Sequence, residues 1–250
     1  MKLPIYQVDA FAKKAFEGNP AAICPLNEWL PDETLRSIAA ENNLSETAFF
    51  IATDNGFHIR WFTPTVEVDL CGHATLAAAF VIFNELNYSQ DKIIFESKSG
   101  PLIIERNDNL LIMDFPAQPP EACDLPAEIE KALTLKPKSV LKADDYIIVV
   151  EDENDVLNEK PDLSLLKNID LRGVIITAIS SDYDFVSRFF APKYGIDEDP
   201  VTGSAHTQLV PYWSKQLNKK NLHAKQVSSR GGELYCENLG DRVSISGYAV

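Results

Sequence analysis

Two glycine–polar steps in the sequence are candidate anion sites, because each stands immediately before an apolar stretch with helical spacing. The first step is Gly72-His73 and the second is Gly203-Ser204. The first turn of a helix presents unpaired N–H groups and a partial positive charge, and glycine lets a ligand come close to the backbone. Each step could therefore hold a carboxylate or a developing oxyanion. In the alternative, Ser204 and His73 only cap their helices.

Glu46 and His73 are the first candidates for moving a proton. Glu46 stands at the start of a predicted strand, residues 47–52, beside an apolar run. A carboxylate at the edge of apolar surface loses hydration, which favours its protonated form and suits it to acid/base work. A solvated turn or cap carboxylate is the alternative. His73 is expected to be neutral, because a helix N-terminus disfavours the imidazolium, and so able to donate or accept one proton.

Two further residues near the glycine steps could take part. Asp199 ends the acidic triplet that begins at Asp197, and three clustered acids repel one another at a cost to stability unless a site uses them. A solvated acidic loop is the alternative. Cys71 precedes Gly72, where a helix N-terminus would favour the thiolate. Its counterpart in the second step is Thr202, so a symmetric two-thiol mechanism is not expected, and a small buried filler is the simpler interpretation.

The elements that must position these residues occur twice along the chain. Residues 60–64 read Arg-Trp-Phe-Thr-Pro and residues 188–192 read Arg-Phe-Phe-Ala-Pro, and each motif is followed by a short acidic loop and a glycine step. A further glycine follows 28 residues after each step, at Gly100 and at Gly231. Three landmarks in the same order at nearly constant spacing indicate an internal duplication.

The two copies are predicted at residues 4–115 and 145–247. We therefore expect an N-terminal half, 1–117, and a C-terminal half, 118–250, whose last residues could cross back. Within each copy, β-branched and aromatic runs between Gly, Asn and Asp turns predict strands, and one long helix follows each glycine step. The predicted fold class is α+β, with two pseudo-symmetric halves, each a strand-rich barrel around a central helix. We expect the reaction site in the cleft between the halves.

Composition excludes several kinds of partner. The chain of 250 residues is 45% hydrophobic and 24% charged, with a formal net charge of −14. Nucleic acid and anionic membrane would be repelled by that charge, whereas a small anionic substrate is compatible with it because a local pocket can oppose the global sign. No apolar run approaches the roughly 20 residues needed to cross a bilayer, so we expect no membrane segment.

Sequence motifs exclude further chemistries. The N-terminus has no signal-peptide pattern and the four cysteines are far apart, which predicts free thiols in the cytoplasm. The sequence has no Walker A motif, no G-x-G-x-x-G, no H-E-x-x-H and no G-x-S-x-G. Its His and Cys residues do not cluster with metal-ligand spacing, so we expect no metal.

Four motifs spread over the chain carry a family resemblance. They are Val8-Asp9-Ala10-Phe11 with Gly18-Asn19-Pro20, then Asn43-Leu44-Ser45-Glu46-Thr47, then Cys71-Gly72-His73-Ala74-Thr75, and finally Glu198-Asp199-Pro200-Val201-Thr202-Gly203-Ser204-Ala205. Together they make essentially the whole chain similar to the phenazine-biosynthesis PhzF-like family, within the diaminopimelate epimerase-like fold. Each motif alone is a weak signal, and their combination is specific.

The resemblance implies a homodimer and catalysis without a cofactor. In the best understood member, which isomerises a dihydro-hydroxyanthranilate, the glutamate that matches Glu46 moves a proton between ring carbons. By the same match, the catalytic residues are Glu46, His73 and Asp199. The substrate-binding residues are Asn19, Gly203 and Ser204, with Gly72 added by its place at the first helix start.

The residues favour a proton-shuttling isomerase of a small carboxylate-bearing substrate, and two alternatives stay open. One is an amino-acid or hydroxy-acid racemase that uses Cys71, although epimerase relatives use two cysteines and this chain keeps at most one. The other is a carboxylate-binding protein without chemistry. The substrate is not carried over, because reaction class transfers between relatives better than substrate does.

Overall fold

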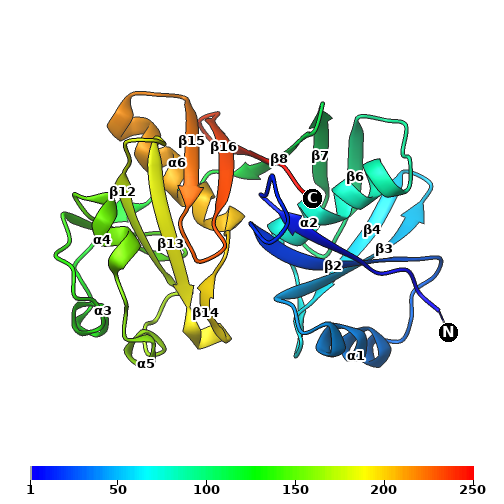
Figure 1. Ribbon diagram of the computed structural model, residues 1–250, viewed down its shortest axis with the longest axis horizontal. Coiled ribbons are helices and arrows are strands. Elements are labelled where there is room, and N and C mark those ends of the chain that lie inside the picture. Colours follow the sequence, from blue (N-terminus) through cyan, green and yellow to red (C-terminus); the bar gives the residue numbers. More distant parts are fainter. Residues whose placement is uncertain (1) are drawn as a thin grey trace. The chain divides into compact units, whose positions relative to one another are not determined.

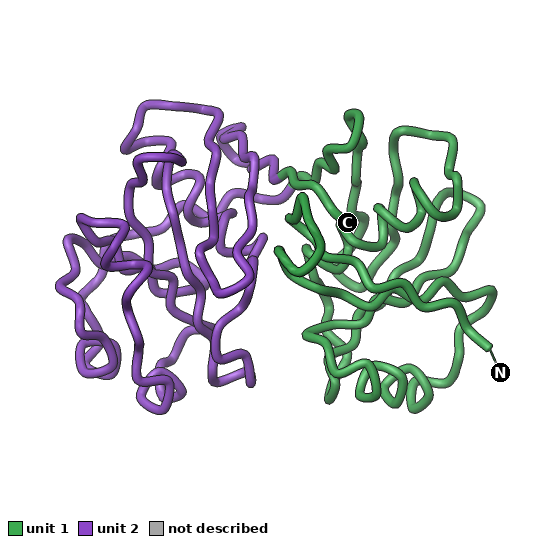
Figure 2. Tube along the Cα trace, in the orientation of Figure 1, with its two compact units in different colours: residues 1–114, 246–250 green, residues 115–245 purple. Residues whose placement is uncertain are grey.

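Strands are the main regular structure of the chain, as its β-branched and aromatic runs predict, and some of them, such as residues 92–96, alternate between exposed and buried side chains. The computed structural model describes residues 2–250, and the chain divides into two compact units (Figure 2). Unit 1 runs to Asp114 and includes Ser246–Val250, and unit 2 is Phe115–Ile245. The C-terminal segment is tied to unit 1 because Val250 exchanges two backbone hydrogen bonds with Asp9, at 2.8 and 3.2 Å.

In its described part, residues 2–114 and 246–250, unit 1 is rich in strands and has two helices (Figure 1). Its strands are β1 Tyr6–Ala10, β2 Asn19–Leu26, β3 Glu46–Thr53, β4 Gly56–Phe62, β5 Glu67–Val68, β6 Lys92–Glu96, β7 Leu102–Asn107 and β8 Leu110–Pro116. Its helices are α1 Asp32–Asn42 and α2 Gly72–Phe80, and a π-helical turn, Val81–Glu85, continues α2.

Unit 2 has the remaining strands and four helices. The strands are β9 Glu121–Ala122, β10 Ser139–Lys142, β11 Tyr146–Val149, β12 Val174–Ile179, β13 Phe185–Ala191, β14 Ile196–Asp199, β15 Asn221–Gln226, β16 Gly232–Asn238 and β17 Arg242–Gly247. The unit boundaries fall within β8, after Asp114, and within β17, before Ser246. The helices are α3 Ala127–Ala132, α4 Glu153–Asn158, α5 Leu163–Leu166 and α6 Gly203–Leu217, with a 3₁₀ turn at Pro192–Tyr194.

The strand pairing is the same in both units, which supports the internal duplication. In unit 1, β1–β2 is antiparallel, β2–β3 parallel, β3–β4 and β4–β5 antiparallel, β4–β6 parallel and β6–β7 antiparallel. Unit 2 has the same order of antiparallel and parallel pairs. They are β10–β11, β11–β12, β12–β13, β13–β14, β13–β15 and β15–β16. The outer helices differ, since α1 has 11 residues and α5 has 4.

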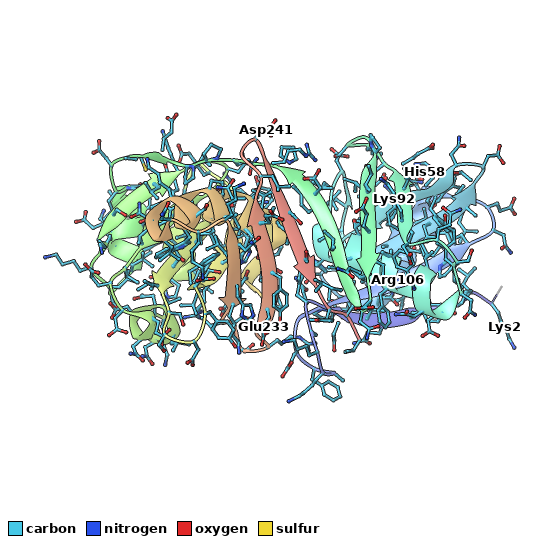
Figure 3. All side chains as sticks on the ribbon, turned by 90° about the horizontal axis from the view of Figure 1, so that it is seen from above. Lys2, His58, Lys92, Arg106, Glu233 and Asp241 are labelled. Atoms are coloured by element: carbon cyan, nitrogen blue, oxygen red, sulfur yellow. The ribbon has the colours of Figure 1, made fainter. Side chains whose placement is uncertain are left out.

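One buried helix lies in each unit. In α2, Ala74 and the run Leu76–Ala79 have no solvent exposure, and the helix packs against β1, β2 and β3. A helix that is apolar all round belongs in a core. In unit 2, α6 packs against β15 and β16, and in Figure 3 the labelled Glu233 lies near the start of β16 and Asp241 in the connection between β16 and β17. The predicted α+β class is therefore confirmed.

The arginine of the repeated motif has an equivalent partner in each unit. Arg60 on β4 donates from Nε and Nη2 to Glu67 on β5, at 2.8 and 2.9 Å. Arg188 on β13 donates in the same way to Glu198 on β14, at 2.6 and 3.0 Å. The hydrogen bond from Arg60 lowers the pKa of Glu67 to about 2. The acidic loop after each motif thus supplies a carboxylate that binds the motif's own arginine.

Two sequence-based exclusions can be compared with the structure. All four cysteines are free thiols, as predicted, and burial raises the pKa of Cys24 to about 12. Among residues 2–250, no helix has both the length and the apolar character that crossing a membrane requires.

Candidate active site

Glu46 and His73 meet in unit 1, at the start of β3 and the start of α2. Glu46 is 9% exposed, and its Oε2 lies 3.3 Å from Nε2 of His73, which is 7% exposed. A strand start and a helix start of the same unit therefore place a carboxylate beside an imidazole in a region with little water. The burial of Glu46 excludes the alternative of a solvated turn residue.

Asn19 determines which nitrogen of His73 carries the proton. Its Nδ2 lies 3.3 Å from Nδ1 of His73, and Sγ of Cys71 lies 3.6 Å from the same nitrogen. With the amide nitrogen of Asn19 as the donor, Nδ1 accepts and the ring proton lies on Nε2. The proton of His73 is thus on the side of the ring that Glu46 approaches.

Gly18 sets the position of Asn19 at the start of β2. Its φ is +67°, and a Cβ built there would lie 2.1 Å from the carbonyl oxygen of Ala10. Both the backbone conformation and the space therefore require glycine. Because Asn19 is fully buried, the tight turn delivers its amide directly to the histidine.

Burial keeps His73 neutral. It lowers the pKa of His73 from 6.5 to about 4, because the imidazolium would lose its hydration. The sequence predicts a neutral histidine from its place at a helix N-terminus, and the structure gives burial as the cause. Neither α2 nor α6 has a side-chain cap at its N-terminus, so the capping alternative for His73 and Ser204 is wrong.

Cys71 joins Glu46 and His73 in a cluster of possible metal ligands. One ligand atom of each lies within 4.8 Å of the others, which the spacing in the sequence did not predict. Carboxylate, imidazole and thiolate are donors that zinc accepts. However, Cys71 approaches Nδ1 of His73 and Glu46 approaches Nε2, and one ion cannot use both contacts. We assign no metal to this cluster.

Asp199 is held in unit 2 by a compact polar network. It ends β14, is 7% exposed and accepts a short hydrogen bond from Oγ1 of Thr202. Gln226 donates to the backbone oxygen of Asp199 at 2.7 Å and accepts from the backbone N–H of Thr202 at 2.8 Å. Glu198 pairs with Arg188 and Asp199 is buried, so these two acids are not part of a solvated loop, whereas Asp197 is exposed.

Gly203 and Ser204 begin α6 beside a buried ion pair. Oγ of Ser204 accepts a hydrogen bond from Nη1 of Arg172 at 2.9 Å. Arg172 also donates from Nε to Oδ1 of Asp145 at 2.9 Å, and its Nη2 contacts the other oxygen. Asp145 has no solvent exposure and accepts a further bond from Gln208 at 2.6 Å.

The residues predicted from sequence thus fall into two groups. At the start of α2, the structure brings together Asn19, Glu46, Cys71, Gly72 and His73. At the start of α6, it places Asp199, Gly203 and Ser204.

Sequence reasoning missed the side chains that hold the second group. These are Arg172, Asp145, Gln208 and Gln226. Apart from a contact of Gln208 with the backbone of Ser204, their partners are 24 to 63 residues away in the chain, so no local pattern could signal them. The one usable signal is position, because Arg172 directly precedes Gly173, the residue that the repeat aligns with Glu46.

Comparison with known sequences gives matches over the whole chain. A family model described as phenazine biosynthesis-like protein, PhzC-PhzF, matches residues 8–250. A Pseudomonas aeruginosa protein named as an uncharacterized isomerase is 52% identical over 250 residues, covering 100% of this chain and 96% of the relative. A second uncharacterized isomerase, from Halalkalibacterium halodurans, is 44% identical over 256 residues, with coverage of 100% and 96%.

Comparison with solved structures extends the similarity to the fold. A phenazine biosynthesis protein of the PhzF family from Enterococcus faecalis has a TM-score of 0.98 at 49% identity, covering 100% of this chain and 96% of that one. A hydroxyproline epimerase from Agrobacterium vitis, with trans-4-hydroxy-L-proline bound, has a TM-score of 0.61 at 8% identity, with coverage of 99% and 90%. At that identity the second similarity is one of fold alone.

Proposed function

The chain belongs to the phenazine biosynthesis-like protein family, and from that premise we propose that it is a cofactor-independent isomerase of a small carboxylate-bearing substrate. Glu46 removes a proton from one carbon and returns it to another. The observation that carries this proposal is the approach of buried Glu46 to neutral His73, at 3.3 Å. The expected isomerase class is confirmed by the relatives, which are named isomerases.

The proton step uses two groups of unit 1. Glu46 acts as the base, since a buried carboxylate has few water molecules to displace before it meets a C–H group. His73 carries its proton on the nitrogen nearest Glu46, so it can donate to the carboxylate or to an oxygen of the substrate where charge develops. Because its pKa is about 4, His73 acts as a neutral donor and adds no positive charge at pH 7.

The anion is assigned to unit 2. The first N–H groups of α6, at Gly203 and Ser204, form the kind of helix N-terminus that binds carboxylates. Asp199 is positioned just before them and assists the proton step.

A racemase that uses Cys71 is a second candidate, favoured by one contact. Sγ of Cys71 lies 3.6 Å from Nδ1 of His73, close enough for a thiol–imidazole exchange of protons. The fold it would need is shared with a hydroxyproline epimerase. Replacing Cys71 by Ala discriminates between the two functions, because the glutamate mechanism predicts full activity in that variant.

Solvent deuterium tests the proposal. A panel of small carboxylates with an acidic C–H group is incubated in deuterated water, and NMR follows incorporation of deuterium. We expect exchange with at least one compound and a loss of at least about a hundredfold in Glu46→Gln, as for removal of a general base. Glu105→Gln is the matched control, because Glu105 is an exposed acid of the same unit that pairs with Lys92. An unchanged rate in folded Glu46→Gln would exclude the role.

A further inference from the structure

Strands β3 and β12 occupy equivalent places in the two units, and their registers give a residue-by-residue alignment. Phe62 of the first repeated motif pairs with Thr47, and Phe190 of the second pairs with Val174. Thr47 therefore aligns with Val174. One residue earlier, Glu46 aligns with Gly173, and two residues earlier Ser45 aligns with Arg172.

The same junction carries different chemistry in each unit. The helix starts align Gly72 with Gly203, and hence His73 with Ser204. In unit 1, Glu46 at the strand start approaches His73 at the helix start, at 3.3 Å. In unit 2, Arg172 just before the strand donates to Ser204 at the helix start, at 2.9 Å. An acid–base pair in one copy is thus replaced by a cation–hydroxyl pair in the other.

Arg172 is held rigidly by its other neighbours. Two of its nitrogens contact both oxygens of Asp145, and its guanidinium lies 5.2 Å from the ring centre of Phe189. Asp145 is fully buried and would be costly without a partner, and Gln208 satisfies it further. Burial alone would lower the pKa of Arg172, but the hydrogen bond and charge of Asp145 more than offset it. The guanidinium is therefore a fixed positive charge.

The bond between Arg172 and Ser204 determines what the serine can do. A guanidinium only donates, so Oγ of Ser204 is the acceptor in this bond and its own proton must be directed to another group. Within residues 2–250, the hydrogen bonds of Arg172 use three of its five N–H donors, and the side chain is 35% exposed. Two N–H donors thus remain at the start of α6, on a guanidinium whose charge is balanced by Asp145.

We propose that Arg172 is a positioning and specificity-determining residue that makes Ser204 a donor to a carboxylate and disfavours uncharged analogues. Asp145 and Gln208 act through Arg172, by fixing its guanidinium. The inference deepens the proposed function and rests on it, since it takes the start of α6 as the place where the substrate anion binds.

Calorimetric titration with benzoate and with the neutral isostere benzamide tests this inference. We expect wild-type protein to bind benzoate more tightly than benzamide. Arg172→Met and Ser204→Ala should each weaken benzoate binding by about tenfold to a hundredfold, the range for a hydrogen bond to a charged group. Because Arg172 acts through Ser204, the double variant should bind within about twofold of the weaker single variant.

Two control variants separate binding from folding. Arg60 is a comparable arginine, since it also pairs with a carboxylate, that of Glu67, and also lies over an aromatic ring, but it does not contact Ser204. The Arg60→Met variant should therefore bind benzoate as tightly as wild type does. Arg172→Lys keeps a positive charge beside Asp145, so it should fold, and it should still bind benzoate more weakly because it loses the fork. If Arg172→Lys fails to fold, the role of Arg172 is structural and the inference is wrong.

Three binding results would overturn the inference. The first is that folded Arg172→Lys or Arg172→Met binds benzoate as tightly as wild type. The second is that the loss of benzoate affinity in the double variant equals the product of the losses in the two single variants. The third is that wild-type protein binds benzoate no more tightly than benzamide. Glu46→Gln keeps failure of the proposed function distinguishable, because it should abolish deuterium exchange and bind benzoate normally. If no exchange is found while benzoate binding depends on Arg172, the isomerase proposal fails and this inference stands.

Discussion

Buried histidines occur near the start of both central helices, and both are neutral because of burial. His206, on α6, has no solvent exposure, and its Nδ1 lies 2.9 Å from the backbone oxygen of Thr202. Burial lowers the pKa of His206 to about 4, and the bond to Thr202 opposes this only in part. His73 has the same pKa for the same reason. Each histidine therefore binds a proton less readily in the folded chain than in the unfolded one.

The first prediction concerns acid stability. Below pH 6.5 the unfolded chain takes up protons at these histidines that the folded chain does not, so the free energy of unfolding should decrease as the pH falls from 6.5 toward 4. For His206 the loss is on the order of 3 kcal/mol when the pH reaches 4. Urea unfolding at a series of pH values measures it.

A histidine variant assigns that loss to its source. His206→Asn retains a donor for the oxygen of Thr202 and cannot titrate, so its free energy of unfolding should depend less steeply on pH than that of wild type. Equal pH dependence in wild type and His206→Asn would contradict the account.

At the scale of elements, the turn from β1 into β2 determines the position of the site more than any helix does. The turn contains Gly18 in the left-handed region and leads to Asn19, which holds His73. Its closing hydrogen bond runs from the backbone of Phe16 to Oδ2 of buried Asp9, at 2.8 Å. A local conformational requirement is thus coupled directly to the tautomer of the histidine.

The second prediction follows from that turn. Gly18→Ala combines a strained φ with a Cβ only 2.1 Å from the oxygen of Ala10, whereas Gly240→Ala has a φ of +95° with open space around it. The clash should make Gly18→Ala less stable than Gly240→Ala by at least about 1 kcal/mol, the lower end of overpacking costs. Thermal or denaturant unfolding of the two variants measures the difference, and equal stabilities would show that the turn relaxes freely.

The sequence predicted elements well where the signal was local. The strand after Glu46 and the helices after Gly72 and Gly203 follow from periodicity, and the structure has them. Periodicity could not reveal that the first helix changes to a π-helical turn at Val81, because the apolar spacing continues through it. It also gave no sign of Arg172, whose contacts depend on tertiary structure.

At the scale of the whole molecule, duplication has kept the scaffold and changed the chemistry. The two units share their strand pairing and their motif arginines, yet Glu46 aligns with Gly173 and His73 with Ser204. Two matched bases are therefore absent from the aligned positions, which favours one glutamate that shuttles a proton.

The homodimer implied by the family resemblance stays a prediction, and light scattering should give twice the chain mass of 27.9 kDa.

The fate of a deuterium label tests the single-glutamate mechanism most directly. The first compound that the exchange panel identifies is labelled at the carbon that loses its proton and is converted in ordinary water, and mass spectrometry follows the product from the earliest turnovers. Because Glu46 is only 9% exposed, its captured deuteron should exchange slowly with solvent, and part of the label should appear at the new carbon of the same molecule. A product that contains no label even in the first turnover would contradict the account, because it would require a second, solvent-exchanged proton donor.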